Sequence, residues 1–354
     1  MRIWEFVITG GPCSGKSTGL DVVEQVLTKR NFKVIVVAET ATELILSGIT
    51  PKELGVKKFQ EILIDRLINK EKTARKAARC FKKDVVILYD RGLLDSKAYM
   101  PEDMFRTELA KHKKNEVKAR DQYDGVFHLV TAADGAEEFY TLENNAARTE
   151  TPEEARELDR KTRNAWVGHP RLRIIDNSTP FKEKIDRLVQ EISSVIGLPI
   201  PIQTKKRYLV KKPSEKVLEK VDGITSLNIL QTYLSSKPTE RRVRQKGVGT
   251  DFSYYYTEKK EISKISSYMM EKKISEKEYL SYLIDGIRSV RKTINCFVYN
   301  NQYFELDIYP TWEEEAILEI ELTSESQDVI LPNWVEVIKD VTEDPNYKNY
   351  NLAK

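Results

Sequence analysis

The chain has 354 residues, enough for two domains with a full core each, and its 40% hydrophobic and 32% charged residues are typical of a soluble globular protein. No apolar run approaches the roughly 20 residues that span a bilayer, and no signal-peptide pattern opens the chain, so we expect a cytoplasmic protein without a transmembrane segment. The three cysteines fit neither a disulfide framework nor a zinc site, and the net charge of +3 hides a strong asymmetry within the second half.

The first half alternates between predicted strands and helices. A buried strand at 3–9 is followed by apolar residues at helical spacing over 16–31. Later helices open with capping signals at Thr50 and Thr151. The five predicted strands are 3–9, 32–39, 84–92, 125–131 and 172–177. Strands that alternate with helices predict an α/β domain with a five-stranded parallel sheet over residues 1–200.

The turn between the first strand and the first helix carries a phosphate-loop motif. It reads GGPCSGKST and matches G-x-x-x-x-G-K-[ST] at every defined position. The glycines let backbone N–H groups converge on phosphate oxygens, Lys16 reaches the β and γ phosphates, and Ser17 ligates Mg²⁺. The predicted nucleotide-binding residues are Gly10, Gly11, Pro12, Cys13, Ser14, Gly15, Lys16, Ser17 and Thr18. An N-K-x-D motif is absent, so these residues do not choose between GTP and ATP.

Three charged residues lie at the ends of predicted strands, at the edge of the sheet where ligands bind in this architecture. Asp90 could hold Mg²⁺ with Ser17 or position a water or an acceptor hydroxyl; the alternative is a helix-capping aspartate. Arg91 could reach a phosphate. Glu39 is either a general base or an acid in the first turn of a helix.

An arginine-rich stretch precedes the fifth strand, where a lid that closes on the phosphates would lie. It contains Arg148, Arg156, Arg160 and Arg163. Most exposed helix arginines only solvate their helix, and Arg148 is the one that we expect to act. The predicted catalytic residues are Lys16, Glu39, Asp90, Arg91 and Arg148.

Several segments of this domain resemble one P-loop family. They are VITGGPCSGKST, VVAETATELI, LYDRGLLDSKAYM, NNAARTETPEEAR and AWVGHP with IIDN. Together they are similar to the family shared by ribosylnicotinamide kinases and TRPL translocation defect protein 14. The resemblance implies either nucleoside phosphorylation or a GTP-binding switch.

The second half, residues 201–354, reads as strands that carry paired charges at spacing two. Residues 203–246 hold 12 Lys or Arg against 4 Asp or Glu, whereas 305–345 hold 1 against 13. Such charges could simply face water. Their recurrence in strand after strand, basic early and acidic late, instead predicts one polar interior. A nucleic-acid partner is not expected, because no recognised motif accompanies the basic charge.

This pattern is similar to the CYTH family of triphosphate tunnel metalloenzymes, on the segments KRYLV, RRVRQK, TEK, FELDIY and LEIEL. The resemblance implies an α+β antiparallel barrel whose interior binds polyphosphate and a divalent metal. The family opens with E-x-E-x-K, but the chain has Gln203, Lys205 and Arg207 there. This exchange favours holding an anion over cleaving it, so we do not expect an active triphosphatase. The predicted anion-binding residues are Lys205, Arg207, Arg242, Arg244, Lys246 and Lys259, and a residual cation site would use Asp307, Glu319 and Glu321.

The order of the two domains resembles the TRPL translocation defect protein 14 family over nearly the whole chain, including the tail DPNYKNYNLAK. That resemblance implies GTP binding in the first domain, with or without slow hydrolysis, and recognition of an anionic phospholipid, phosphatidic acid, in the second. The basic stretch 205–212 could contact a membrane peripherally or be an ordinary solvated strand end. The alternative function is an ATP-dependent small-molecule or nucleoside kinase with a phosphate-binding tunnel domain.

Overall fold

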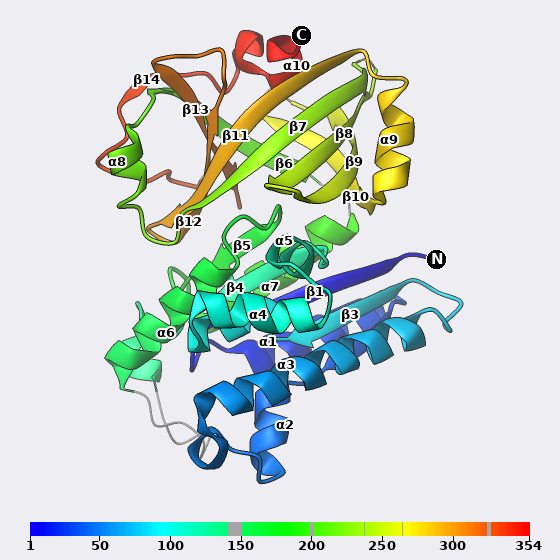
Figure 1. Ribbon diagram of the computed structural model, residues 1–354, viewed down its shortest axis with the longest axis vertical. Helices are drawn as coiled ribbons and strands as arrows, with labels where there is room; N and C mark the ends of the chain where they lie inside the picture. Colours follow the sequence, from blue (N-terminus) through cyan, green and yellow to red (C-terminus); the bar gives the residue numbers. More distant parts are fainter. Residues whose placement is uncertain (141–150, 199–201, 237, 264, 324–326) are drawn as a thin grey trace. The chain divides into compact units, whose positions relative to one another are not determined.

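The computed structural model describes residues 1–140, 151–198, 202–236, 238–263, 265–323 and 327–354. The chain divides into two compact units, Met1–Ile192 and Ser193–Lys354, and Figure 1 shows a helix-covered sheet in the first and a curved sheet in the second. No helix of the described residues combines the length and the apolar character that crossing a bilayer requires.

The first unit is built on a parallel sheet with strand order β2-β3-β1-β4-β5. Its strands are β1 (Ile3–Thr9), β2 (Lys33–Val37), β3 (Val85–Asp90), β4 (Gly125–Leu129) and β5 (Leu172–Ile175). The predicted five-stranded parallel sheet is therefore confirmed. Every residue of β4 is buried, because helices cover both faces of a parallel sheet.

Seven helices of the described residues surround this sheet. They are α1 (Lys16–Lys29), α2 (Thr40–Leu46), α3 (Pro51–Ala78), α4 (Glu102–Lys111), α5 (Glu116–Arg120), α6 (Pro152–Ala165) and α7 (Phe181–Ile196). Two 3₁₀ helices, η1 (Leu93–Tyr99) and η2 (Glu137–Phe139), lie in the connections. The caps at Thr50 and Thr151 form as expected, since each hydroxyl accepts a hydrogen bond from the backbone N–H three residues later.

The second unit is an antiparallel sheet that closes on itself. Its strands are β6 (Ile202–Lys211), β7 (Thr225–Ser235), β8 (Glu240–Val248), β9 (Asp251–Glu261), β10 (Ser266–Ile274), β11 (Arg288–Tyr299), β12 (Gln302–Ile308), β13 (Glu315–Leu322) and β14 (Val337–Asp340). The order runs β10-β9-β8-β7-β11-β12-β13-β6, and β10 pairs with the start of β6 to complete the ring. The predicted α+β antiparallel barrel is thus confirmed, with β14 added beside β6.

Short helices and an apolar layer cover the outside of the barrel. The helices on the outside are α8 (Glu215–Leu218) and α9 (Glu276–Leu283). The 3₁₀ helix η3 (Pro345–Tyr347) and α10 (Asn349–Leu352) instead pack against Tyr233, Tyr309 and Ile317, which lie on the inward-facing positions of the barrel. Phe297, Phe304, Leu306, Leu318 and Ile320 form the centre of an apolar cluster on the outer side. Each such side chain contributes about 1.5–3 kcal/mol on burial. The charged side chains on the alternate positions of β12 and β13 therefore point to the opposite face, the barrel interior.

Candidate nucleotide and anion sites

The phosphate loop is held in shape by close contacts at its glycines. Gly10 has φ 144° and Gly15 has φ 88°, both unfavourable for other residues. A Cβ atom would lie 2.1 Å from the Leu129 carbonyl oxygen at Gly10 and 2.6 Å from the Phe181 ring at Gly15. Since α1 begins directly after Gly15, its free N–H groups are available at the loop for an anion.

Lys16 folds back over the loop that precedes it. Its Nζ donates to the backbone oxygens of Gly10 at 3.1 Å and Gly11 at 2.8 Å, and to Ser14 Oγ at 3.2 Å. Burial and then the positive charge of Arg91 lower the Lys16 pKa to about 8. A bound phosphate would reverse this effect and favour the ammonium form. Ser17 and Thr18 next to it are exposed and line the same cavity.

Asp90 lies beside the loop because β3 pairs with β1 in register, with Asp90 opposite Ile8. Burial and then the charge of Glu39 raise the Asp90 pKa to about 6. Its buried Oδ1 has no hydrogen-bond partner among the described residues. A buried carboxylate oxygen without a partner, next to a phosphate loop, is suited to binding a cation or a ligand hydroxyl.

Glu39 and Arg91 form an ion pair at the edge of the cavity. Arg91 Nε donates to Glu39 Oε1 at 2.6 Å, and Thr42 Oγ1 donates to Glu39 Oε2 at 2.7 Å. Burial by itself would raise the Glu39 pKa, but Arg91, Lys16 and the Thr42 hydroxyl lower it to about 2. Arg91 has φ 67°, a strained backbone conformation of the kind that clusters at functional sites.

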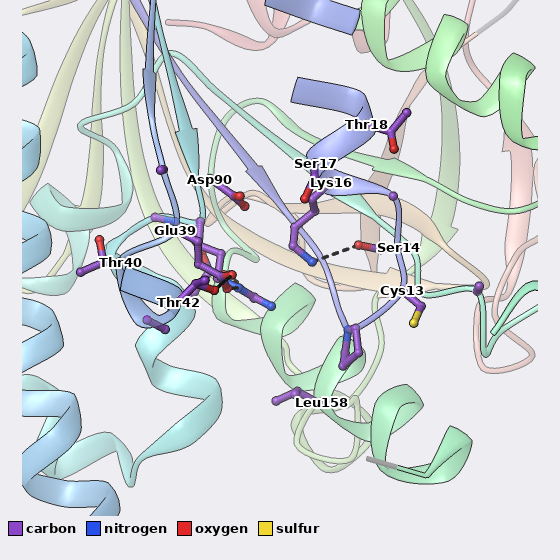
Figure 2. Close-up of a pocket in the computed structure, with 18 of the residues that line it drawn as sticks. Cys13, Ser14, Lys16, Ser17, Thr18, Glu39, Thr40, Thr42, Asp90 and Leu158 are labelled. Atoms are coloured by element: carbon purple, nitrogen blue, oxygen red, sulfur yellow. Dashed lines mark hydrogen bonds and ion pairs between the residues drawn. The ribbon is translucent and has the colours of Figure 1, made fainter. Parts of the chain in front are cut away.

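These residues surround one large cavity of about 1640 Å³. Figure 2 shows Lys16, Ser17, Glu39 and Asp90 around the same part of it. The structure thus brings together the loop residues from Pro12 to Thr18 with Glu39, Asp90 and Arg91. Gly10 and Gly11 do not line the cavity. The predicted Arg148 lies outside the described residues.

Two of the other lid arginines, Arg156 and Arg160, contact α6 itself or a neighbouring loop. Arg156 donates to Glu153 at 2.8 Å and to the Ala133 carbonyl oxygen at 2.6 Å. Arg160 donates to Glu157 at 2.8 Å. These contacts fit the alternative that such arginines mainly solvate their helix.

Asp159 of α6 is a site residue that the sequence analysis missed. Its Oδ1 accepts hydrogen bonds from the backbone N–H of Gly11 at 2.6 Å and of Thr131 at 3.1 Å. Its Oδ2 lies 3.0 Å from His128 Nε2. Only 4% of the side chain is exposed, so α6 is fastened to the base of the phosphate loop through this buried carboxylate.

The predicted cationic residues share one face inside the barrel. Register places Arg207 opposite Glu319, and Arg242 opposite Thr257 with Lys259 two positions further along β9. Burial and then the charges of Arg242, Arg207 and Lys205 lower the Lys259 pKa to about 7. Arg207 and Lys205 are on β6, which does not neighbour β9, the strand of Lys259. These charges therefore interact across the interior, and Lys259 makes no ion pair with any residue that the structure describes.

The remaining cations of this face are already paired. Arg242 donates to Glu240 at 2.7 Å and Arg244 to Glu271 at 2.8 Å. Lys246 is 1% exposed and also has contacts inside the fold. Both guanidinium groups nevertheless keep a buried Nε–H without a hydrogen-bond partner among the described residues. The interior can therefore offer Lys259 together with these two donors to an incoming anion.

The three acids of the predicted cation site are paired as well. Glu319 accepts from Arg207 at 2.8 Å and from Lys205 at 3.1 Å, Glu321 from Gln203 at 2.6 Å, and Asp307 from Lys292. Burial raises the Asp307 pKa. Within the described ranges, no three acidic, histidine or cysteine side chains form a group that could hold a metal ion.

Comparison with known proteins gives one family and a weak structural likeness. The profile of a family described as AAA domain matches residues 5–184, just over half of the chain. No curated protein matches the sequence.

Among solved structures, the chain is similar to the protein NE1496, described once as a hypothetical protein and once as an inorganic triphosphatase. Both share 26% identity over 43% of this chain, covering 97% and 93% of theirs, with TM-scores of 0.31 and 0.30. The PH1012 protein from Pyrococcus horikoshii OT3 shares 17% identity over 33% of this chain and 77% of its own, with a TM-score of 0.26. Scores of this size do not by themselves assign a fold or a function.

Proposed function

Because this chain belongs to the AAA domain family, we propose that its first unit binds a nucleoside triphosphate with Mg²⁺ and that its barrel binds an anionic phosphate group. One observation supports nucleotide binding by the first unit. The phosphate loop opens onto a cavity that is lined by Lys16, Ser17 and Asp90, and one oxygen of Asp90 has no partner among the described residues. The loop supplies backbone donors and Lys16 supplies a positive charge, which together suit a chain of phosphates.

The residues present fit a magnesium ion. Hydroxyl and carboxylate oxygens are its preferred protein ligands, and Ser17 and Asp90 provide one of each beside the loop. Bound Mg²⁺ would neutralise charge on the phosphate oxygens. Asp90 must be ionised for this role, which its pKa of about 6 allows at neutral pH.

We propose GTP as the preferred nucleotide, on the resemblance of the whole chain to the TRPL translocation defect protein 14 family. Titration calorimetry with GTP and with ATP in Mg²⁺ tests this. Lys16→Ala should abolish binding, whereas Lys29→Ala, which removes an exposed lysine from the same helix, should not. A preference for ATP would contradict the GTP assignment alone; equal binding by Lys16→Ala would contradict the loop site.

For the barrel, the proposed ligand is the headgroup of phosphatidic acid. Lys259 supports it, because this partly buried cation lies near Arg242, Arg207 and Lys205 without an ion pair to any described residue. Flotation with vesicles of phosphatidylcholine, with and without phosphatidic acid, provides the test, and phosphatidylserine vesicles control for general attraction to anionic lipid. Lys259→Gln should reduce recovery and the exposed neighbour Lys260→Gln should not. Equal recovery from all vesicles would contradict the lipid assignment.

A second candidate function is phosphoryl transfer to a small acceptor. It is favoured by the ionised Glu39, which lies close enough to Lys16 to influence its pKa and could hydrogen-bond an acceptor hydroxyl. A kinase releases the nucleoside diphosphate only when an acceptor is present, whereas a GTPase turns over slowly alone. Measuring diphosphate release with and without a panel of nucleosides separates these two activities.

A further inference from the structure

The turns at one end of the parallel sheet carry a group of exposed cations. α1 ends at Lys29 and α3 ends at Ala78, and the turns after them lead into the starts of β2 and β3. Figure 1 shows the turn after α3 at the end of the sheet where β1 also starts. We call this group the amino-edge patch and define it by its exposed cations Lys29, Arg30, Lys76, Arg79, Lys82 and Lys83.

The two turns that carry the patch lie side by side. Lys83 Nζ donates to Asn31 Oδ1 at 3.5 Å, and the backbone N–H of Lys33 donates to the carbonyl oxygen of Asp84 at 2.9 Å. The two patch residues at the end of α3 are three positions apart, so they share one side of the helix. The cations of both turns therefore belong to one surface, which continues along the end of α3.

Little negative charge offsets the patch. Elsewhere on the same unit exposed lysines pair with acids, as Lys58 does with Glu61 at 2.8 Å. Glu24, the nearest acid before Lys29, is five positions away and faces another side of α1. Four cations of the patch form no ion pair with any residue that the structure describes, and they are Lys29, Lys76, Arg79 and Lys82.

Two further acids close to the patch in sequence are engaged elsewhere. Glu71 of α3 is fully buried and accepts a hydrogen bond from Tyr123 Oη. Asp84 accepts a hydrogen bond from the backbone N–H of Arg2 at 2.8 Å. The positions three and four residues from Lys76 hold no acid; they are Lys72, Thr73, Arg79 and Cys80. The patch therefore has a clear excess of positive charge.

The composition of the patch favours a diffuse layer of anions as its partner. Four of its six cations are lysines, whose compact charges suit mobile headgroups, whereas arginine forks suit fixed phosphates. No exposed large apolar side chain of the described residues belongs to 29–33 or 72–84. Phe32 packs against Trp4, and Phe81 lies under Lys33. The patch thus offers neither an apolar anchor for a protein partner nor a free ring for stacking a nucleic-acid base.

We propose that the amino-edge patch docks the first unit on an anionic lipid bilayer. A cluster of four to eight cations is of the size that holds a protein at such a surface. The nucleotide cavity lies at the other ends of the strands, about 16 Å away along β3, so docking leaves it open. The proposal goes beyond the phosphate site of the barrel and depends neither on that site nor on nucleotide binding.

Sedimentation with sucrose-loaded vesicles tests this on the full chain without nucleotide, using phosphatidylcholine with and without about 30% phosphatidylserine. The chain should bind the phosphatidylserine vesicles. Raising the NaCl concentration from about 0.1 M to about 1 M should abolish binding, because the Debye length falls from about 10 Å to about 3 Å. Lys76→Gln combined with Lys82→Gln should lower the partition coefficient about 25-fold, about fivefold for each charge.

Lys161→Gln combined with Lys182→Gln is the matched control. It removes the same charge from exposed lysines of α6 and α7, which pair with Glu157 and Asp186, and should change the partition coefficient by about twofold or less. Urea unfolding of both double variants reports on folding. Lys259→Gln should also keep the phosphatidylserine binding, so a failure of the barrel to select phosphatidic acid would leave this result unchanged.

Three results would overturn the bilayer assignment in correctly folded variants. They are binding that phosphatidylserine does not increase, binding that high salt leaves unchanged, and an equal loss in the two double variants. Tighter binding of a short DNA duplex than of the vesicles, lost in the variant of Lys76 and Lys82, would assign the patch to nucleic acid instead.

Discussion

The carboxyl group of Asp90 is buried and lies near the negative charge of Glu39. Both effects raise its pKa, to about 6. Such a group is costly to ionise in the empty site and becomes favourable once a cation shares it. We therefore expect this residue to make nucleotide binding depend on pH.

The affinity of the chain for GTP with Mg²⁺ should fall as the pH drops through about 6, because protonated Asp90 cannot ligate the metal. Asp90→Asn should weaken binding at pH 7.5 and remove this part of the pH dependence. In the nucleotide-free chain the same change should stabilise the fold by about 1–3 kcal/mol above pH 6, where the disfavoured charge is fully present. Calorimetric titrations and urea unfolding over pH 5–8 measure both effects. A wild-type affinity that is flat over this range would contradict the assignment.

Lys259 shows the converse behaviour in the barrel. Burial and neighbouring cations lower its pKa from 10.5 to about 7. Below pH 7 the folded chain holds Lys259 in its charged form, which lowers the free energy of unfolding. The free energy of unfolding should therefore rise as the pH increases from about 7 toward 10.5. An anion in the interior would offset that cost.

Sulfate is a suitable probe of the barrel, because its charge stays constant over this pH range. Its affinity should be steady below about pH 7 and then fall about tenfold per pH unit as free Lys259 loses its proton. Lys259→Arg should flatten the profile, since arginine stays charged. Isothermal titrations between pH 6 and 9 provide the measurement, and an unchanged slope in Lys259→Arg would exclude this lysine as the titrating group.

At the scale of elements, α6 and the phosphate loop form one unit through Asp159. The backbone N–H groups of Gly11 and Thr131 share its Oδ1, and His128 contacts its Oδ2. The helix, which packs against η1, therefore also fixes the start of the loop.

Asp159→Ala should destabilise the fold by about 2–3 kcal/mol, because two buried N–H groups lose their acceptor, and should weaken GTP binding about tenfold. Arg160→Ala on the exposed side of the same helix should change neither quantity. Urea unfolding with and without GTP reports both values. Equal effects of the two substitutions would show that the loop does not depend on this carboxylate.

Much of this arrangement could be predicted from the sequence, because alternating apolar runs and strand-end charges are local patterns. Lys16 and Glu39 come after β1 and β2, Asp90 ends β3, and parallel strands bring their ends to one edge. Asp159 could not be found this way, since Gly11 lies 148 positions earlier and one acid among many on a charged helix looks solvated.

At the scale of the whole molecule, the two compact units have separate cores and separate proposed ligands. A ligand that binds only the folded form of one unit raises the stability of that unit by about 2.7 kcal/mol at a hundredfold excess over its Kd.

Differential scanning calorimetry should therefore resolve two transitions. GTP with Mg²⁺ should raise the midpoint temperature of the first unit's transition, and sulfate should raise that of the barrel's transition. Lys16→Ala should cancel only the first shift and Lys259→Gln only the second. A single transition, or equal shifts of both by either ligand, would show that the units do not respond independently.

The close contacts of the phosphate loop have a kinetic consequence. Leu129 confines Gly10, Asp159 holds Gly11 and Phe181 lies against Gly15. The conformational entropy of this segment is thus lost when the unit folds, and little remains to be lost when a ligand arrives. Encounter with nucleotides should accordingly be fast and similar for different bases, leaving residence time as the quantity that distinguishes one nucleotide from another.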